Sequence, residues 1–137
     1  MISNLIELLD KELDEALLDQ IIWCLSNIAG DCVSHRDIVI NLGTSEKIAK
    51  LALAGTETPE VLGNMAWTLS NLARGKPAPP PETLDVIEKA FYALIDCNNS
   101  ECVKHACWGF SYSTDEDLGR IQTFLNSGKL STIIFLA

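Results

Sequence analysis

A tryptophan-centred motif recurs three times along the chain and constrains its fold more than any other feature. The copies read Trp-Cys-Leu-Ser-Asn at residues 23–27, Trp-Thr-Leu-Ser-Asn at 67–71 and Trp-Gly-Phe-Ser-Tyr at 108–112. Their tryptophans lie 44 and 41 residues apart. Self-similarity at a period of about 40 residues is typical of chains built from stacked structural repeats. The sequence therefore predicts a solenoid of such repeats.

A second, weaker repeat follows the first and third copies of the motif. In residues 36–43 and 119–128, an arginine near the start of a short apolar helix is followed by a glycine, Gly43 or Gly128. Glycine adopts the left-handed backbone conformation at little cost, so it commonly ends a helix. Both segments are thus predicted to be short helices that stop at glycine.

Apolar residues recur at helical spacing through the rest of the chain, and no alternating strand pattern competes with them. The predicted helices span residues 5–9, 14–29, 34–42, 45–53, 59–73, 82–95, 100–113, 115–126 and 130 to the end. One short and two longer helices per repeat fit the armadillo and HEAT class, an all-α right-handed superhelical solenoid, here with about three repeats. The predicted division of this 1–137 armadillo-repeat domain is a partial repeat at 1–31, repeats at 32–75 and 76–113, and a partial repeat at 114–137.

The charge balance restricts the partners that such a chain can bind. Nineteen acidic residues against ten basic ones give a net charge of −9. This excess disfavours binding to nucleic acid, because every nucleic-acid module needs a basic surface, and it favours basic partners. No uninterrupted apolar run reaches the roughly 18 residues of a bilayer span, and residues 1–10 lack the basic segment of a secretory signal. We expect a soluble intracellular protein with no nucleic-acid or membrane partner.

The five cysteines predict neither a disulfide framework nor a zinc ribbon, because their number is odd and no CxxC pair occurs. The most metal-like cluster comprises Cys97, Cys102, His105 and Cys107. Its spacing on a predicted helix points the thiols to different faces, so the cysteines are expected to be small buried hydrophobic residues. We predict no metal and no cofactor.

Catalysis is not expected either. The sequence contains no phosphate-binding glycine loop, HExxH motif or nucleophile elbow. Ser34, His35 and Asp37 are too close together on one short helix to form a catalytic triad. The chain is predicted not to be an enzyme.

A helical wheel places each tryptophan on a narrow polar stripe of its own helix, opposite a broad apolar arc. An exposed tryptophan surface is costly unless a ligand covers it. The alternative, in which each tryptophan fills the core, is weakened by the polar residues beside it. The stripe residues are Gln20, Trp23, Asn27 and Asp31 on the first helix, Asn64, Trp67 and Asn71 on the second, and His105, Trp108 and Tyr112 on the third.

This array is suited to an extended, lysine-rich peptide. Indole faces attract ammonium and guanidinium groups, and the gap between two stacked indoles accepts the aliphatic stem of a lysine. The asparagines can hold the peptide backbone without reading its sequence. Asp31 can meet an ammonium directly, and Asp115 more weakly. Arg74 either repels a basic ligand and divides the surface into two stretches, pairs with a nearby carboxylate, or is a solvated surface residue.

Residues 23–31, 35–40, 67–80 and 106–112 together resemble importin α (karyopherin α), the adaptor family that binds nuclear localisation signals. The resemblance implies that the stripe residues form the main signal-binding groove, with Asp31 contacting a key lysine and Trp108 and Tyr112 closing the groove. His105 stands where the family usually has an aspartate, so one acidic contact is lost or becomes pH-dependent. The implied function is import of cargo proteins into the nucleus, with shuttling between cytoplasm and nucleus.

The resemblance also implies limits. Family members have about ten repeats and a basic segment that binds importin-β, so this chain is expected to be a fragment, a short paralogue or an incomplete gene model that does not recruit importin-β by itself. The apolar ends, residues 2–9 and 130–136, predict self-association. The alternative function is a non-import armadillo scaffold for a basic or extended peptide. The proline-rich segment 76–81 could bind an SH3 or WW domain, but a loop between helices explains it.

Overall fold

The computed structural model describes residues 1–97 and 99–136, and every regular element within them is an α-helix. The helices are α1 (Ile2–Leu8), α2 (Glu15–Asp31), α3 (Val33–Asn41), α4 (Thr44–Ala54), α5 (Pro59–Ala73), α6 (Pro81–Ile95), α7 (Ser100–Ser113), α8 (Leu118–Asn126) and α9 (Lys129–Leu136). The all-α prediction is confirmed.

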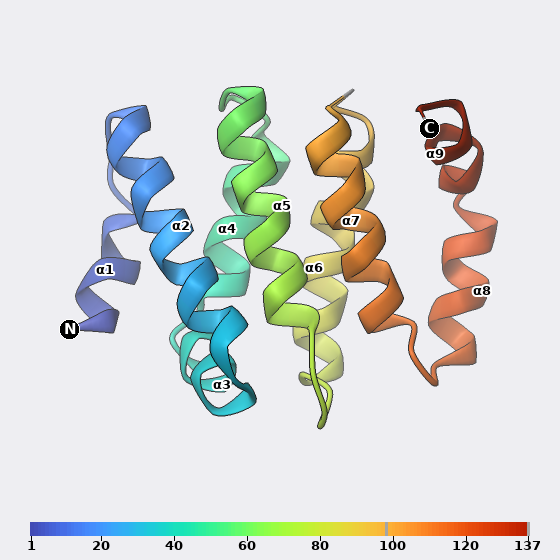
Figure 1. The fold of residues 1–137 in the computed structure, drawn as a ribbon, viewed down its shortest axis with the longest axis horizontal. Helices are drawn as coiled ribbons and strands as arrows, with labels where there is room; N and C mark the ends of the chain where they lie inside the picture. The colour runs from blue at the N-terminus through green and yellow to red at the C-terminus, as the bar shows by residue number, and fades with distance from the viewer. Residues whose placement is uncertain (98, 137) are drawn as a thin grey trace.

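The three tryptophan helices α2, α5 and α7 lie side by side in one layer, with α4 and α6 behind them (Figure 1). Helix α5 packs against both α2 and α7, and α4 packs against α6 in the second layer. Each repeat therefore contacts its neighbours along one axis, as in a solenoid. Within the described residues, no helix is both long enough and apolar enough to cross a membrane.

Most helix boundaries follow the local signals in the sequence. Helices α5 and α7 begin and end where predicted, α5 with Pro59 in its first turn and α7 capped by Asn99, whose side chain accepts from two backbone amides. Gly43 and Gly128 adopt φ angles of 79° and 75°, which confirms their left-handed conformation. Helix α8 differs, because it starts at Leu118 rather than at residue 115. Asp117 caps it by accepting from the Arg120 amide at 3.0 Å.

The buried core extends from α1 to α7, while the described residues of α8 and α9 contribute only the partly buried Phe124 and Ile133, and α5 is the most enclosed helix. Met65, Leu69 and Leu72 on this helix have no exposed surface. Gly109 allows α7 to approach α6 closely. A β-carbon at this position would lie 2.1 Å from the ring of Phe91 on α6. Close packing of this kind fixes how α7 lies against the second layer of helices.

The prediction that the cysteines are buried is wrong for two of them. Cys102 is buried and Cys97 and Cys107 are partly buried, whereas Cys24 and Cys32 are exposed. Cys24 lies on the side of α2 that faces α1, where it lines an apolar hollow with Leu5 and Ile28. Cys32 lies between two helices, where the backbone is extended. A helical wheel describes one helix at a time, so it cannot predict which side of α2 has no close neighbour or how α2 joins α3.

Two arginines join consecutive repeats, which explains the weaker repeat in the sequence. The Arg36 side chain is 1% exposed and donates to the carbonyl oxygens of Arg74 at 2.7 Å and Pro77 at 2.9 Å, in the segment after α5. It also binds Asp37. Arg120 plays the corresponding part on α8 by donating to the Pro81 carbonyl at 3.0 Å and pairing with carboxylates of α6.

We expect Arg36→Ala to lower the free energy of unfolding by about 2–4 kcal/mol, because it removes a buried cation and leaves several carbonyl acceptors without a donor. Arg74→Ala is the matched control. Its side chain is exposed, so the loss should stay within about 0.5 kcal/mol. Urea unfolding followed by circular dichroism measures the stability of both variants. Equal urea midpoints would contradict the stabilising role of the Arg36 side chain.

Candidate peptide-binding surface

The stripe residues of the three tryptophan helices form a nearly continuous aromatic surface. The ring centroids of Trp23 and Trp67 are 6.3 Å apart, and those of Trp67 and His105 are 6.4 Å apart. Trp108 stacks on Tyr112 at 6.0 Å. Trp23 is 49% exposed and Trp108 is 57% exposed, while Trp67 is half-buried between them. These tryptophans do not fill the core, so the core-filling alternative does not hold.

The indoles of Trp23 and Trp67 are not stacked with a gap between them, contrary to our expectation from the sequence. Their planes are inclined at 81°, and the edge of one ring meets the face of the other. This arrangement is favourable because the positive ring edge meets the negative ring face. A lysine stem can pass between them only after one ring rotates. Trp23 is the ring that can do so, because about half of its surface is exposed.

Beside these indoles lies a surface hollow of about 270 Å³ between the C-terminal halves of α2 and α5. Its lining combines a carboxylate, two amides and an indole, which are the groups expected to hold a lysine side chain and a peptide backbone. The lining residues are Ser26, Asn27, Gly30, Asp31, Trp67, Asn71 and Arg74.

The two asparagines of the hollow differ in their surroundings. Asn27 is exposed, and its Nδ2 donates to the Trp23 carbonyl of its own helix at 3.2 Å. Asn71 is only 8% exposed, and its Nδ2 donates to the carbonyl and hydroxyl oxygens of Ser26 at 3.1 and 3.0 Å. Its predicted place on a water-facing stripe is therefore wrong, because α5 packs this face against α2. A β-carbon at Gly30 would lie 2.9 Å from the same Nδ2, so glycine makes room for the amide.

Gln20 and Asn64 lie away from this hollow. The Nδ2 of Asn64 donates to Asp19 at 2.6 Å. Gln20 is exposed and lines a different hollow, of about 410 Å³, together with Glu15, Asp19 and Glu60. The stripe thus extends from an acidic end at these residues to the hollow around Asp31.

A third hollow, of about 340 Å³, lies near the C-terminal ends of α5 and α7 and includes Arg74, Lys76, Tyr112 and Asp115. Lys76 Nζ lies 2.8 Å from Asp115 and 3.4 Å from Glu116. The hydrogen bond to Asp115 raises the pKa of Lys76, and this exposed ion pair means that the carboxylate which the sequence offered to a ligand already has a partner.

Arg74 lies between the hollows of about 270 and 340 Å³, because it lines both of them. In residues 1–97 and 99–136, it takes part in no ion pair. Of the three interpretations from the sequence, pairing with a carboxylate is therefore not supported. The other two interpretations, a cation that divides the surface into two stretches and a solvated surface arginine, both remain predictions.

His105 adds no charge to the surface at neutral pH. It is half-buried, and burial lowers its pKa from the usual value near 6.5. The nearby cation of Lys104 lowers the pKa further, while Glu101 opposes the shift. The imidazole beside Trp67 is thus neutral at pH 7 and becomes a repelling cation only in more acidic solution.

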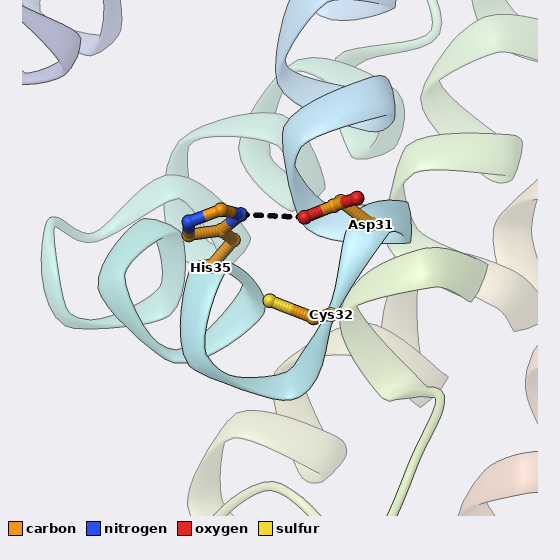
Figure 2. A group of neighbouring side chains, drawn as sticks. All are labelled: Asp31, Cys32 and His35. Atoms are coloured by element: carbon orange, nitrogen blue, oxygen red, sulfur yellow. Dashed lines mark hydrogen bonds and ion pairs between the residues drawn. The ribbon is translucent and has the colours of Figure 1, made fainter.

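One group of side chains next to the hollow was not predicted from the sequence. Figure 2 shows Asp31, Cys32 and His35 at the junction of α2 and α3. Asp31 Oδ2 and His35 Nδ1 lie 2.8 Å apart. The ligand atoms of the three side chains lie close enough together to hold one metal ion, whereas the described residues around Cys102 do not bring their ligand atoms together in this way. The signal that could have found them is the run Asp-Cys-Val-Ser-His, which holds a Cys and a His three residues apart.

Comparison with solved structures identifies the class of fold. The designed armadillo repeat protein YIII(Dq.V1)4CPAF in complex with peptide (KR)4 matches with a TM-score of 0.76 and 24% identity, over 96% of this chain and 54% of that one. The designed armadillo repeat protein YIII(Dq)4CqI matches with a TM-score of 0.75 and 21% identity, over 96% and 55%. The chain therefore has the armadillo-repeat fold, with about three repeats.

Sequence comparison identifies the relatives. Importin subunit alpha-5 of Arabidopsis thaliana is 32% identical over 90% of this chain and 24% of its own length. Importin subunit alpha-1b of Oryza sativa subsp. japonica is 34% identical over 89% and 23%, and probable importin subunit alpha-A of Dictyostelium discoideum is 30% identical over 96% and 26%. No family model matches the sequence.

The chain is therefore a homologue of importin α over most of its length, as the motifs of the sequence indicated. It spans about a quarter of the length of the curated relatives that it matches.

We expect Asn71→Ala to destabilise the protein by about 1–2 kcal/mol, because it removes two hydrogen bonds between α5 and α2 from a buried position. Asn27→Ala should change the free energy of unfolding by less than about 0.5 kcal/mol, because that amide is exposed and its hydrogen bond is to a carbonyl of its own helix. Denaturant unfolding measures the free energy of unfolding of the two variants. Equal losses of stability would show that the burial of Asn71 has no energetic consequence.

Proposed function

We propose that this chain is a peptide-binding part of a nuclear import adaptor and that it binds lysine-rich nuclear localisation signals of cargo proteins along the α2–α5–α7 surface. The hollow around Asp31 carries the proposal, because it places a carboxylate, an indole and amide groups within one cavity of about 270 Å³. An ammonium group there meets Asp31 while its aliphatic stem lies on Trp67.

The comparisons support the same ligand chemistry. The chain is homologous to importin α subunits, and a designed protein of the same fold is described as a complex with the basic peptide (KR)4. The net charge of −9 would attract such a peptide over a distance. The proposed activity is binding rather than catalysis, and it implies residence in both cytoplasm and nucleus.

Trp23→Ala and Trp67→Ala are expected to weaken the binding of a lysine-rich peptide by roughly 2- to 30-fold each. This range corresponds to the loss of about 0.5–2 kcal/mol of contact between indole and cation. Phe135→Ala is the matched control, because Phe135 is an aromatic residue on α9, 89% exposed and far along the chain from the tryptophan motifs. Isothermal titration calorimetry with each variant measures the effect.

The control for charge alone is a second peptide with the same residues in another order, in which the glycines of the first peptide separate the basic residues. Equal affinity of the two peptides for the wild type, or unchanged affinity in both tryptophan variants, would reduce this surface to a generic acidic patch. Circular dichroism of each variant verifies that the fold is retained.

His105→Asp is expected to tighten binding of the lysine-rich peptide by about 2- to 5-fold, because it adds a carboxylate beside Trp67 at a half-buried position. His105→Asn replaces the imidazole without adding charge and should leave the affinity unchanged at pH 7, where the lowered pKa of His105 keeps it neutral. Fluorescence anisotropy of a labelled peptide compares the three proteins. Equal affinity of His105→Asp and His105→Asn would place the peptide away from His105.

A further inference from the structure

We propose that Asp31, Cys32 and His35 form a binding site for a divalent transition-metal ion, best suited to zinc, at the junction of α2 and α3. One ligand atom from each side chain, a carboxylate oxygen, a thiol sulfur and an imidazole nitrogen, lies within 4.8 Å of the other two. The three side chains gather on one side of the junction (Figure 2). Mixed oxygen, sulfur and nitrogen donors are the ligand set that zinc accepts in proteins.

The distances are close to those that an ion requires. Ligand atoms on one tetrahedral zinc ion lie about 3.3–3.7 Å apart, given bond lengths of roughly 2.0–2.3 Å. Asp31 Oδ2 and His35 Nδ1 are 2.8 Å apart, so they separate slightly when the ion replaces the hydrogen bond between them. The sulfur approaches by rotation of an exposed side chain. Three protein ligands leave the fourth position to water.

The local backbone holds these ligands on rigid elements. Asp31 is the last residue of α2, Cys32 precedes α3 in an extended conformation with φ −151° and ψ 164°, and His35 lies in the first turn of α3. The Cys32 side chain makes no capping hydrogen bond to α3, so its sulfur is free of that competing contact. The thiol proton passes to solvent when the sulfur–metal bond forms, and the helix N-terminus stabilises the resulting thiolate.

The site shares Asp31 with the hollow around Trp67 and Asn71. A zinc ion of charge +2, bound by one carboxylate and one thiolate, forms a neutral complex. The carboxylate then no longer attracts an ammonium group. Metal binding should thus weaken the binding of a lysine-rich peptide, and this consequence rests on the proposed function, whereas the metal site itself does not.

Cobalt titration of the reduced chain without peptide tests the site directly. We expect one equivalent of Co²⁺ to produce a thiolate-to-cobalt charge-transfer absorption, which Zn²⁺ then displaces. Cys32→Ser should abolish this absorption, and His35→Ala should weaken cobalt binding by more than tenfold. Cys24→Ser is the matched control, because Cys24 is also exposed but belongs to no such ligand group among the described residues, and it should bind like the wild type.

An absorption that survives in Cys32→Ser, or that is lost in Cys24→Ser, would overturn the site, as would wild type without any thiolate absorption. All three substituted side chains are exposed, so circular dichroism should show an unchanged fold.

Peptide titration with and without saturating Zn²⁺ tests the shared use of Asp31. We expect zinc to weaken binding about 3- to 10-fold in the wild type, which corresponds to the loss of one partly exposed charge pair, and to leave Cys32→Ser unaffected. Equal peptide affinities in wild type with and without zinc would overturn the competition. A wild type that binds cobalt but no peptide would refute the proposed function and leave the metal site standing.

Discussion

The packing of α5 between α2 and α7 is the constraint on which the rest of the structure depends. A repeat helix of this kind cannot bury its apolar arc alone, so it must have a neighbour on each side. Once both neighbours are in place, Met65 and Leu69 are fully buried, and little more than the stripe through Trp67 still reaches the surface. The same packing brings Trp23 within 6.3 Å of Trp67. The aromatic surface is thus a consequence of how the repeats stack.

The arginines determine how one repeat is oriented on the next. Arg36 donates to the Arg74 and Pro77 carbonyls from a position that excludes water, which raises the strength of each hydrogen bond and the cost of losing it. These bonds hold the end of α5 against the start of α3. Asp31 and Arg74, which belong to different repeats, therefore face the same hollow at a fixed separation. The position of the hollow thus depends on Arg36, which is not among the residues that line it.

Local chemistry made much of this fold predictable from the sequence. Pro59, Asn99 and Gly43 act on their own segments, so the helix ends that they set were predicted from the residues alone. Features that depend on two repeats at once were not: the burial of Asn71 against Ser26, the edge-to-face contact of the indoles and the exposure of Cys32 all arise between elements. The predicted limits of the individual repeats remain a prediction, as does self-association through the apolar ends.

Charge at the surface is more unevenly distributed than the net value of −9 suggests. Lys76 pairs with Asp115, His105 is uncharged at pH 7, and Arg74 contributes a cation beside the central hollow. Of the residues lining that hollow, Asp31 alone carries a negative charge. Any cation that binds there must use this carboxylate, whether it is the ammonium of a lysine or a metal ion held with Cys32 and His35. Since one carboxylate cannot fully neutralise both cations, each ligand is expected to weaken the binding of the other for an electrostatic reason, independent of their shapes.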